Sequence, residues 1–125
     1  MSFFTNLFGK KKPATSFPGV IIAKIISVEP HPNADRLRIA KVNIGQPETA
    51  QIVCGAPNIE VGQLVPLATI GTILPNGVTI KAATIRGVES AGMLCATDEL
   101  GIGSDHSGIK ILSAGVPGEA IDAYL

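Results

Sequence analysis

The chain has 125 residues, of which 46% are hydrophobic and 16% charged, with ten basic and ten acidic residues. This composition is typical of one folded domain and excludes a disordered chain. No apolar run reaches the length of a membrane span, and no signal-peptide pattern follows the early lysines. Cys54 and Cys95 form no disulfide framework, so we expect reduced thiols in a cytoplasmic protein.

The net charge of zero hides an uneven distribution along the chain. The lysines at positions 10–12 supply three of the ten basic residues, and every acidic residue lies beyond residue 28. From Phe17 onward, seven basic residues face ten acidic ones, a net charge of −3. Because nucleic-acid-binding proteins usually carry a basic surface, any such surface here must be local or must include the N-terminal segment.

Residues 1–16 differ from the rest and are predicted to form a flexible amphipathic and basic arm. Phe3, Phe4, Leu7 and Phe8 lie at helical spacing before a lysine-rich linker. The arm can anchor the protein to a partner groove or an anionic lipid surface, or its phenylalanines can pack on the domain. We expect at most weak, reversible membrane contact, because one short helix binds a bilayer poorly.

Residues 17–125 are predicted to form one domain of short strands. The predicted strands cover residues 20–28, 37–44, 51–54, 64–70, 71–74, 78–85, 93–96 and 109–112, and a last short helix covers residues 119–125. Leu37, Ile39 and Val42 are expected near one face of their strand, and Asn76-Gly77 is a turn signal. Closely spaced strands favour a closed sheet, because closure removes exposed edges. We therefore predict an all-β fold, a small five-stranded OB-fold barrel with added strands and short helical turns.

Few residues point to catalysis or to a bound metal. The segment His31 to Leu37, HPNADRL, brings together His, Asn and Asp, yet its prolines and Asx residues are also typical of a structural turn. The two histidines and two cysteines show no metal-ligand spacing, and no catalytic motif is present. We expect no catalytic residue, no metal and no cofactor.

Basic side chains provide the remaining candidate for a site. Lys41, Lys81, Arg36, Arg38 and Arg86 can line one face of the barrel, where arginine suits phosphate and base edges. The alternative is a solvated surface with ordinary charge pairs. Aromatic residues are nearly absent from the domain, which argues against binding of bare single strands by stacking. Recognition of a folded RNA by shape and backbone needs few aromatics.

Several motifs in order resemble the tRNA-binding domain family. They are HPNADRLRIAKVNIG, QIVCGAPNIEVGQLVPLATIGTILPNGVTIKAATIRGVESAGMLCATDELGI and DHSGI, and the resemblance covers residues 19–125. The chain is most similar to the version near the N-terminus of the bacterial phenylalanyl-tRNA synthetase β subunit. The resemblance implies an OB-fold barrel that binds tRNA and has no catalytic activity of its own.

The resemblance also implies a set of RNA-binding residues around the segment KAATIRGVESAGMLCA. Arg86 is expected to contact phosphate or a base, with Lys81 nearby, while Ser90 offers a hydroxyl. Gly92 is expected to let the backbone approach closely, and Met93 to give an adaptable apolar contact. Asn33 is expected to lie at the same groove and to fix its loop.

Partners follow from the same resemblance, with one alternative left open. Free-standing members of the family are often homodimers, so a homodimer is expected, and an aminoacyl-tRNA synthetase is a candidate protein partner. The lead-in sequence departs from the β-subunit pattern, so the chain resembles a free-standing domain. The acidic domain and apolar arm also suit a protein-interaction or chaperone-like module on the same barrel.

Overall fold

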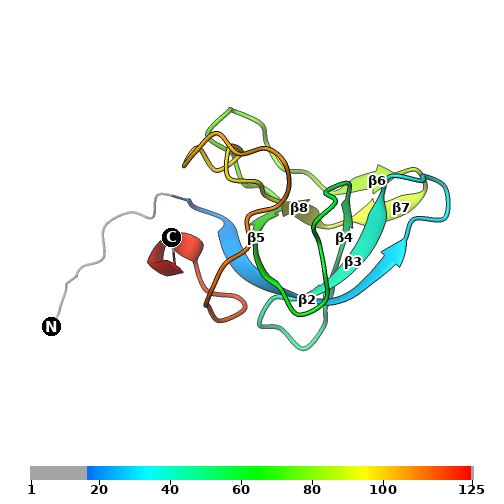
Figure 1. Cartoon of the computed structure of the whole chain (residues 1–125), viewed down its shortest axis with the longest axis horizontal. Helices are drawn as coiled ribbons and strands as arrows, with labels where there is room; N and C mark the ends of the chain where they lie inside the picture. Colours follow the sequence, from blue (N-terminus) through cyan, green and yellow to red (C-terminus); the bar gives the residue numbers. More distant parts are fainter. Residues whose placement is uncertain (1–16, 125) are drawn as a thin grey trace, which may run out of the picture.

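The computed structural model describes residues 17–124, which are almost entirely β-structure (Figure 1). The arm predicted over residues 1–16 and the final Leu125 lie outside the described residues. The elements are β2 (Val20–Pro30), β3 (Arg38–Asn43), β4 (Ala50–Cys54), β5 (Leu64–Thr69), β6 (Ala83–Ile85), β7 (Val88–Ser90), β8 (Gly92–Leu94) and the 3-10 turn η1 (Ile121–Tyr124). Within the described chain no helix is long or apolar enough to cross a membrane.

The long strand β2 is shared by two sides of the barrel. It pairs antiparallel with β5 through residues 20–24 and with β3 through residues 24–30. The register shifts between Ile25 and Ser27, which leaves Ile26 45% exposed at a bulge. Because a bulge bends a strand and increases its twist, β2 can curve around the core, as Figure 1 shows.

The sheet order β4-β3-β2-β5-β8 brings the two edge strands toward each other. The backbone N–H of Ala91, between β7 and β8, donates to the carbonyl of Gln51 on β4 at 2.9 Å. The N–H of Val53 on β4 donates to the hydroxyl of Ser90 at 3.0 Å. These bonds link the edges into a nearly closed barrel, and the predicted all-β, OB-like fold is confirmed.

Alternating apolar residues fill the barrel. Ala40 and Val42 on β3 are fully buried, as are Ile25 on β2 and Ile52 on β4. A second cluster lies between β2, β5 and the C-terminal segment, and Ile121 of η1 is fully buried in it. Burying each large aliphatic side chain contributes about 1.5–3 kcal/mol, so this interior provides a rigid support for the surface loops.

Three predicted strands are wrong in whole or in part because their hydrogen bonds are divided between partners. Residues 71–74 contribute only an isolated bridge, between Ile73 and Thr79. Of residues 78–85 only Ala83–Ile85 form a strand, since the Ile80 N–H turns back to the Thr72 carbonyl around the predicted Asn76-Gly77 turn. Residues 109–112 form only isolated bridges, because the Lys110 N–H bonds to Cys95 while the Leu112 N–H bonds to Leu64.

Two smaller expectations also need correction. Ile39 and Val42 do not share a face of β3, because residues three apart in a strand point to opposite sides; Val42 is buried with Ala40, and Ile39 is half-buried. The predicted C-terminal helix is one 3-10 turn, Ile121–Tyr124.

Candidate nucleic-acid interface

A tight hairpin carries the arginine that the sequence singles out. Strands β6 and β7 pair from Ala83↔Ser90 to Ile85↔Val88, which leaves Arg86 and Gly87 as a two-residue turn. Their φ angles are +53° and +87°, the pattern of a type I′ turn. Among the described residues other than glycine, Arg86 alone has a positive φ. This conformation costs an L-residue about 1–2 kcal/mol, so the turn holds Arg86 at a strained position.

The HPNADRL turn between β2 and β3 holds the tip of this hairpin. His31 is 6% exposed, and its Nε2 donates to the Ile85 carbonyl at 2.9 Å. Its Nδ1 accepts the backbone N–H of Asn33 at 2.9 Å. The Asn33 Nδ2 then donates to the Arg86 carbonyl at 3.0 Å. Two consecutive carbonyls of the hairpin are therefore bonded to a turn more than fifty residues away in the sequence.

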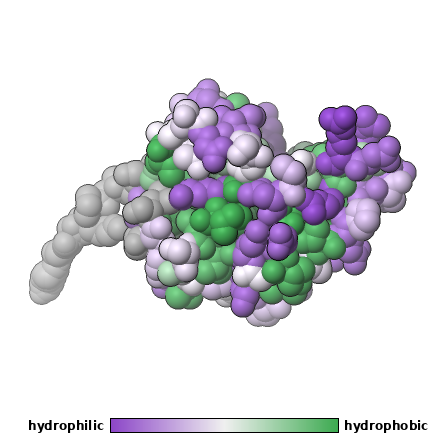
Figure 2. Space-filling model, in the orientation of Figure 1, coloured by the Kyte–Doolittle hydropathy of each residue, from purple (hydrophilic) through white to green (hydrophobic). Residues whose placement is uncertain are grey.

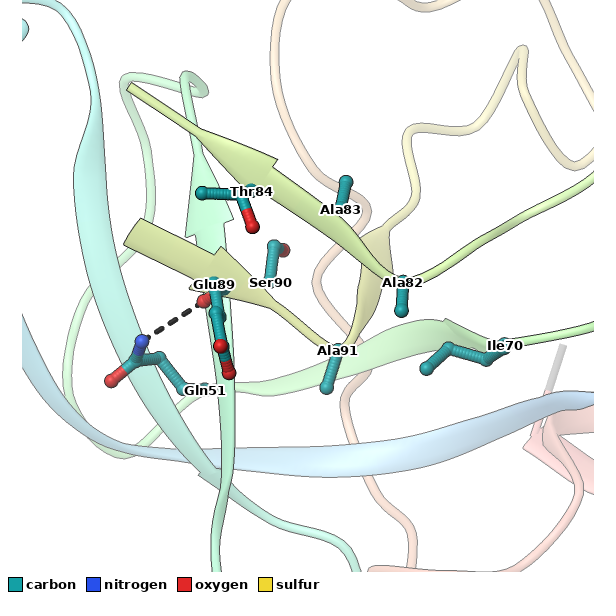
Figure 3. Close-up of a pocket in the computed structure, with 8 residues that line it drawn as sticks. All are labelled: Gln51, Ile70, Ala82, Ala83, Thr84, Glu89, Ser90 and Ala91. Carbon is teal, nitrogen blue, oxygen red and sulfur yellow. Dashed lines mark hydrogen bonds between the residues drawn. The ribbon is translucent and has the colours of Figure 1, made fainter. Parts of the chain in front are cut away.

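The base of the hairpin is fixed to strand β4. Figure 3 shows the Gln51 side chain pointing from β4 to the hairpin, where its Nε2 donates to the Glu89 carbonyl at 2.9 Å. Ser90 at the end of β7 accepts the Val53 N–H and donates to the Gly92 carbonyl at 3.1 Å. A shallow pocket of about 470 Å³ lies between β4 and the hairpin. The hairpin is thus bound to the barrel at both ends.

An open pocket of about 550 Å³ lies beside the tip and is lined by Arg86 together with residues 33–37. Arg36 and Arg86 are both exposed there, with Asn33 and Asp35 on the same rim. At the right of Figure 2, hydrophilic residues gather over this end of the barrel. We name this group of four residues the arginine tip. The rim thus carries two exposed guanidinium groups and one carboxylate, and guanidinium groups have the chemistry for contacts to anions.

The structure brings together only some of the residues predicted for RNA binding. Asn33 and Arg86 are in direct contact. Ser90 is 3% exposed and its hydroxyl already has two partners within the fold. Lys81 is exposed in the segment before β6.

Gly92 and Met93 lie on β8, outside the pocket at the arginine tip. A Cβ on Gly92, whose φ is +153°, would meet the Ala68 carbonyl at 2.7 Å, so the backbone of β8 approaches β5 too closely for a side chain. Met93 is half-buried and packs against the second apolar cluster. Both residues therefore contribute to the packing of the barrel.

The five basic residues expected on one face are also divided. Arg38 is half-buried and donates to the carbonyls of Ala56 at 2.8 Å and Ile59 at 3.4 Å, so it supports the loop after β4. Lys41 is exposed on the outer face of β3. Arg36, one of these five, lines the same pocket as Arg86. His31, which holds the hairpin, was not predicted as a site residue. The two prolines beside His31 were the signal that its turn is rigid.

A second polar cluster lies in the loop before the C-terminal segment. His106 Nδ1 pairs with Asp98 Oδ2 at 2.8 Å, and this hydrogen bond, with the carboxylate charge, raises the pKa of His106. Nearby, burial raises the pKa of the Cys54 thiol, and burial followed by the Glu99 charge raises that of Cys95 to about 12. Residues 17–124 contain no group of three His, Cys, Asp or Glu that could hold a metal ion.

The fold and the arginine tip define a small OB-type barrel with an exposed arginine at the tip of a hairpin. The chain matches the family described as "Putative tRNA binding domain" over residues 20–120. This protein therefore belongs to the tRNA-binding domain family, as the sequence motifs predict.

Curated relatives place the same module within larger proteins. The chain is 52% identical over 125 residues to the phenylalanine–tRNA ligase beta subunit of Chlorobaculum tepidum, covering 96% of this chain and 15% of that subunit. It is 53% identical over 110 residues to the same subunit of Bacteroides thetaiotaomicron, covering 85% of this chain and 13% of the relative. The chain thus spans a small fraction of the relatives it matches.

Solved structures share the fold. The C-terminal domain of Plasmodium vivax p43 superposes with a TM-score of 0.57 at 24% identity, covering 79% of this chain and 56% of that one. A MetRS-related protein from Pyrococcus horikoshii gives 0.54 at 19% identity, covering 81% and 85%. A Naegleria gruberi RNA ligase gives 0.54 at 15% identity, covering 66% and 29%. At these identities the likeness concerns the barrel alone.

Proposed function

We propose that this protein is a non-catalytic accessory module that binds tRNA through the arginine tip. The observation that carries the proposal is the contact between Asn33 and Arg86, which places the strained hairpin arginine beside Arg36 in an open pocket. Membership of the tRNA-binding family supplies the class of ligand. The two guanidinium groups supply the chemistry, because planar forks bind phosphate oxygens in pairs.

The composition of the domain indicates how such binding works. The body has a net charge of −3, so long-range attraction to RNA is weak and a few close contacts must provide the affinity. Aromatic side chains are absent from the arginine tip, which favours contacts to the backbone of a folded RNA over stacking on unpaired bases. We therefore expect modest affinity and little discrimination among tRNA sequences.

The relatives suggest the setting in which this module works. They are beta subunits of phenylalanine–tRNA ligases, and this chain corresponds to 13–15% of their length. We infer that the module holds tRNA for an aminoacyl-tRNA synthetase in the cytoplasm. A homodimer would present two arginine tips and raise the avidity of a weak site. Light scattering at micromolar concentration checks this: a dimer mass supports the inference, and a monomer mass contradicts it.

The test of tRNA binding is an affinity measurement over a salt series. Fluorescence anisotropy with labelled tRNA is performed on the full chain and on a variant lacking residues 1–16. If the arginine tip binds tRNA, both proteins give a linear fall of log affinity with log salt. Arg86→Ala should reduce the slope by about 1, whereas Lys24→Ala, the same charge change on β2, should reduce the slope much less.

Two results would contradict the proposal. Binding that disappears with residues 1–16 would assign it to the lysines at positions 10–12 instead of the barrel. Absence of binding in both proteins would favour the protein-interaction function, which a pull-down that survives nuclease treatment would then support.

A further inference from the structure

We propose that His31 is a positioning residue for tRNA binding: its imidazole holds the hairpin tip so that Arg86 faces the RNA. The inference rests on the proposed function, because it assigns how the arginine tip is held in its binding conformation. His31 itself is 6% exposed, so the residue acts through the hairpin and not by contact with the ligand.

The hydrogen bonds define one protonation state of the ring. Nδ1 accepts the N–H of Asn33 at 2.9 Å and so carries no proton. Nε2 faces the carbonyl oxygen of Ile85 at 2.9 Å and must donate, because a carbonyl can only accept. The neutral Nε2–H tautomer therefore joins the β2–β3 turn to the residue immediately before Arg86.

The hairpin needs this hydrogen bond to the β2–β3 turn because its tip is strained. Arg86 adopts a φ of +53°, which is unfavourable for a side chain other than Gly, Asn or Asp. Strained conformations persist only where the surroundings hold them. Here the surroundings are two bonds to consecutive carbonyls, from His31 to Ile85 and from Asn33 to Arg86. His31 also orients Asn33 through its backbone, so one buried ring supports both bonds.

Two matched variants separate the two bonds of the ring. In His31→Gln, the amide nitrogen can replace Nε2 and donate to Ile85, keeping the tie to the hairpin. In His31→Asn, the amide oxygen of the shorter side chain can replace Nδ1 and accept the N–H of Asn33. This variant keeps the hydrogen bond within the turn and loses the one to Ile85. Thermal unfolding of each variant, followed by circular dichroism, verifies that both are folded at the assay temperature.

The expected result is a difference between these variants in binding labelled tRNA. His31→Asn should weaken binding on the order of threefold to tenfold, the coupling usual for residues joined by a hydrogen-bond network. His31→Gln should bind within about twofold of the unchanged protein. In an Arg86→Ala background, His31→Asn should cause no further loss, because the arginine that it positions is gone.

Backbone ¹⁵N order parameters at Arg86 and Gly87 provide a readout that needs no tRNA. They should fall in His31→Asn and remain high in His31→Gln. Order parameters that stay high in both variants, or an equal loss of affinity with and without Arg86, would overturn the positioning role. If the order parameters change as expected but the unchanged protein binds no tRNA, the tie is real and the proposed function is wrong.

Discussion

The hydroxyl of Ser90 accepts the backbone N–H of Val53 at 3.0 Å, across 37 residues of sequence. It also donates to the Gly92 carbonyl at 3.1 Å, so this side chain joins β4 to the chain between β7 and β8. A serine that the sequence motifs assign to RNA contact is therefore one of the groups that close the barrel.

Ser90→Ala should destabilise the fold without changing the binding site. The substitution leaves the buried Val53 N–H without a partner, which costs about 1–3 kcal/mol. We expect the urea midpoint to fall by this free energy, while tRNA affinity below the unfolding transition stays within about twofold. Ser104→Ala, at an exposed serine, is the control and should change neither quantity. A loss of affinity in folded Ser90→Ala would show that Ser90 takes part in tRNA binding.

The comparison of sequence and structure shows which features depend on local pattern. Continuous apolar runs predict β2 and β5, because residues 20–25 and 64–69 are largely buried. The start of β6 was not predicted, since residues 78–85 carry a continuous strand signal. In the structure, residues 71–80 instead pair with themselves around the Asn76-Gly77 turn. Tertiary hydrogen bonds decide where that strand begins.

The prediction of site residues depended on the family motifs and not on residue spacing. Asn33 and Arg86 are in contact as expected, although nothing in the spacing of 53 residues indicates it. Ser90 contacts β4 and Gly92 contacts β5. Both strands lie far away in the sequence, so the local pattern does not predict these contacts. His31 was assigned to a turn, and the sequence alone does not show that the same ring reaches Ile85.

Arg86→Asn should separate stability from binding. Asparagine tolerates a positive φ and is a favoured residue at the first position of a type I′ turn. Relief of the strain at Arg86 should raise the free energy of unfolding by about 1 kcal/mol. Loss of the guanidinium should weaken tRNA binding about tenfold, the effect of one charged contact. Urea denaturation and anisotropy measure the two effects. A fall in stability would show that the arginine side chain supports the hairpin.

The two cysteines should be protected in the folded protein, and to different degrees. Cys95 is fully buried with a pKa raised to about 12, so almost no thiolate exists near pH 8. Cys54 is 8% exposed and lines a pocket of about 340 Å³. We expect a thiol reagent such as dithionitrobenzoate to modify Cys54 first and Cys95 only on unfolding. In urea both should react together, and rapid native reaction of Cys95 would contradict its burial.

The pair of His106 and Asp98 should make stability depend on pH in a defined direction. The hydrogen bond to Asp98 and its charge raise the pKa of His106 above the ordinary value of 6.5, so folding favours the protonated ring. The stabilisation is therefore complete below about pH 6 and is lost as the pH rises through the raised pKa. Because the ring is 74% exposed, salt should weaken the effect.

The measurement is the difference in unfolding free energy between the unchanged protein and His106→Gln from about pH 5 to pH 9. All other titratable groups are common to both proteins, so the difference isolates this pair. It should be positive at low pH and decline toward high pH. Asp98→Asn is the matched variant: NMR titration of the His106 ring should then give a pKa near its ordinary value. A difference that is constant with pH would mean that His106 is not paired in solution.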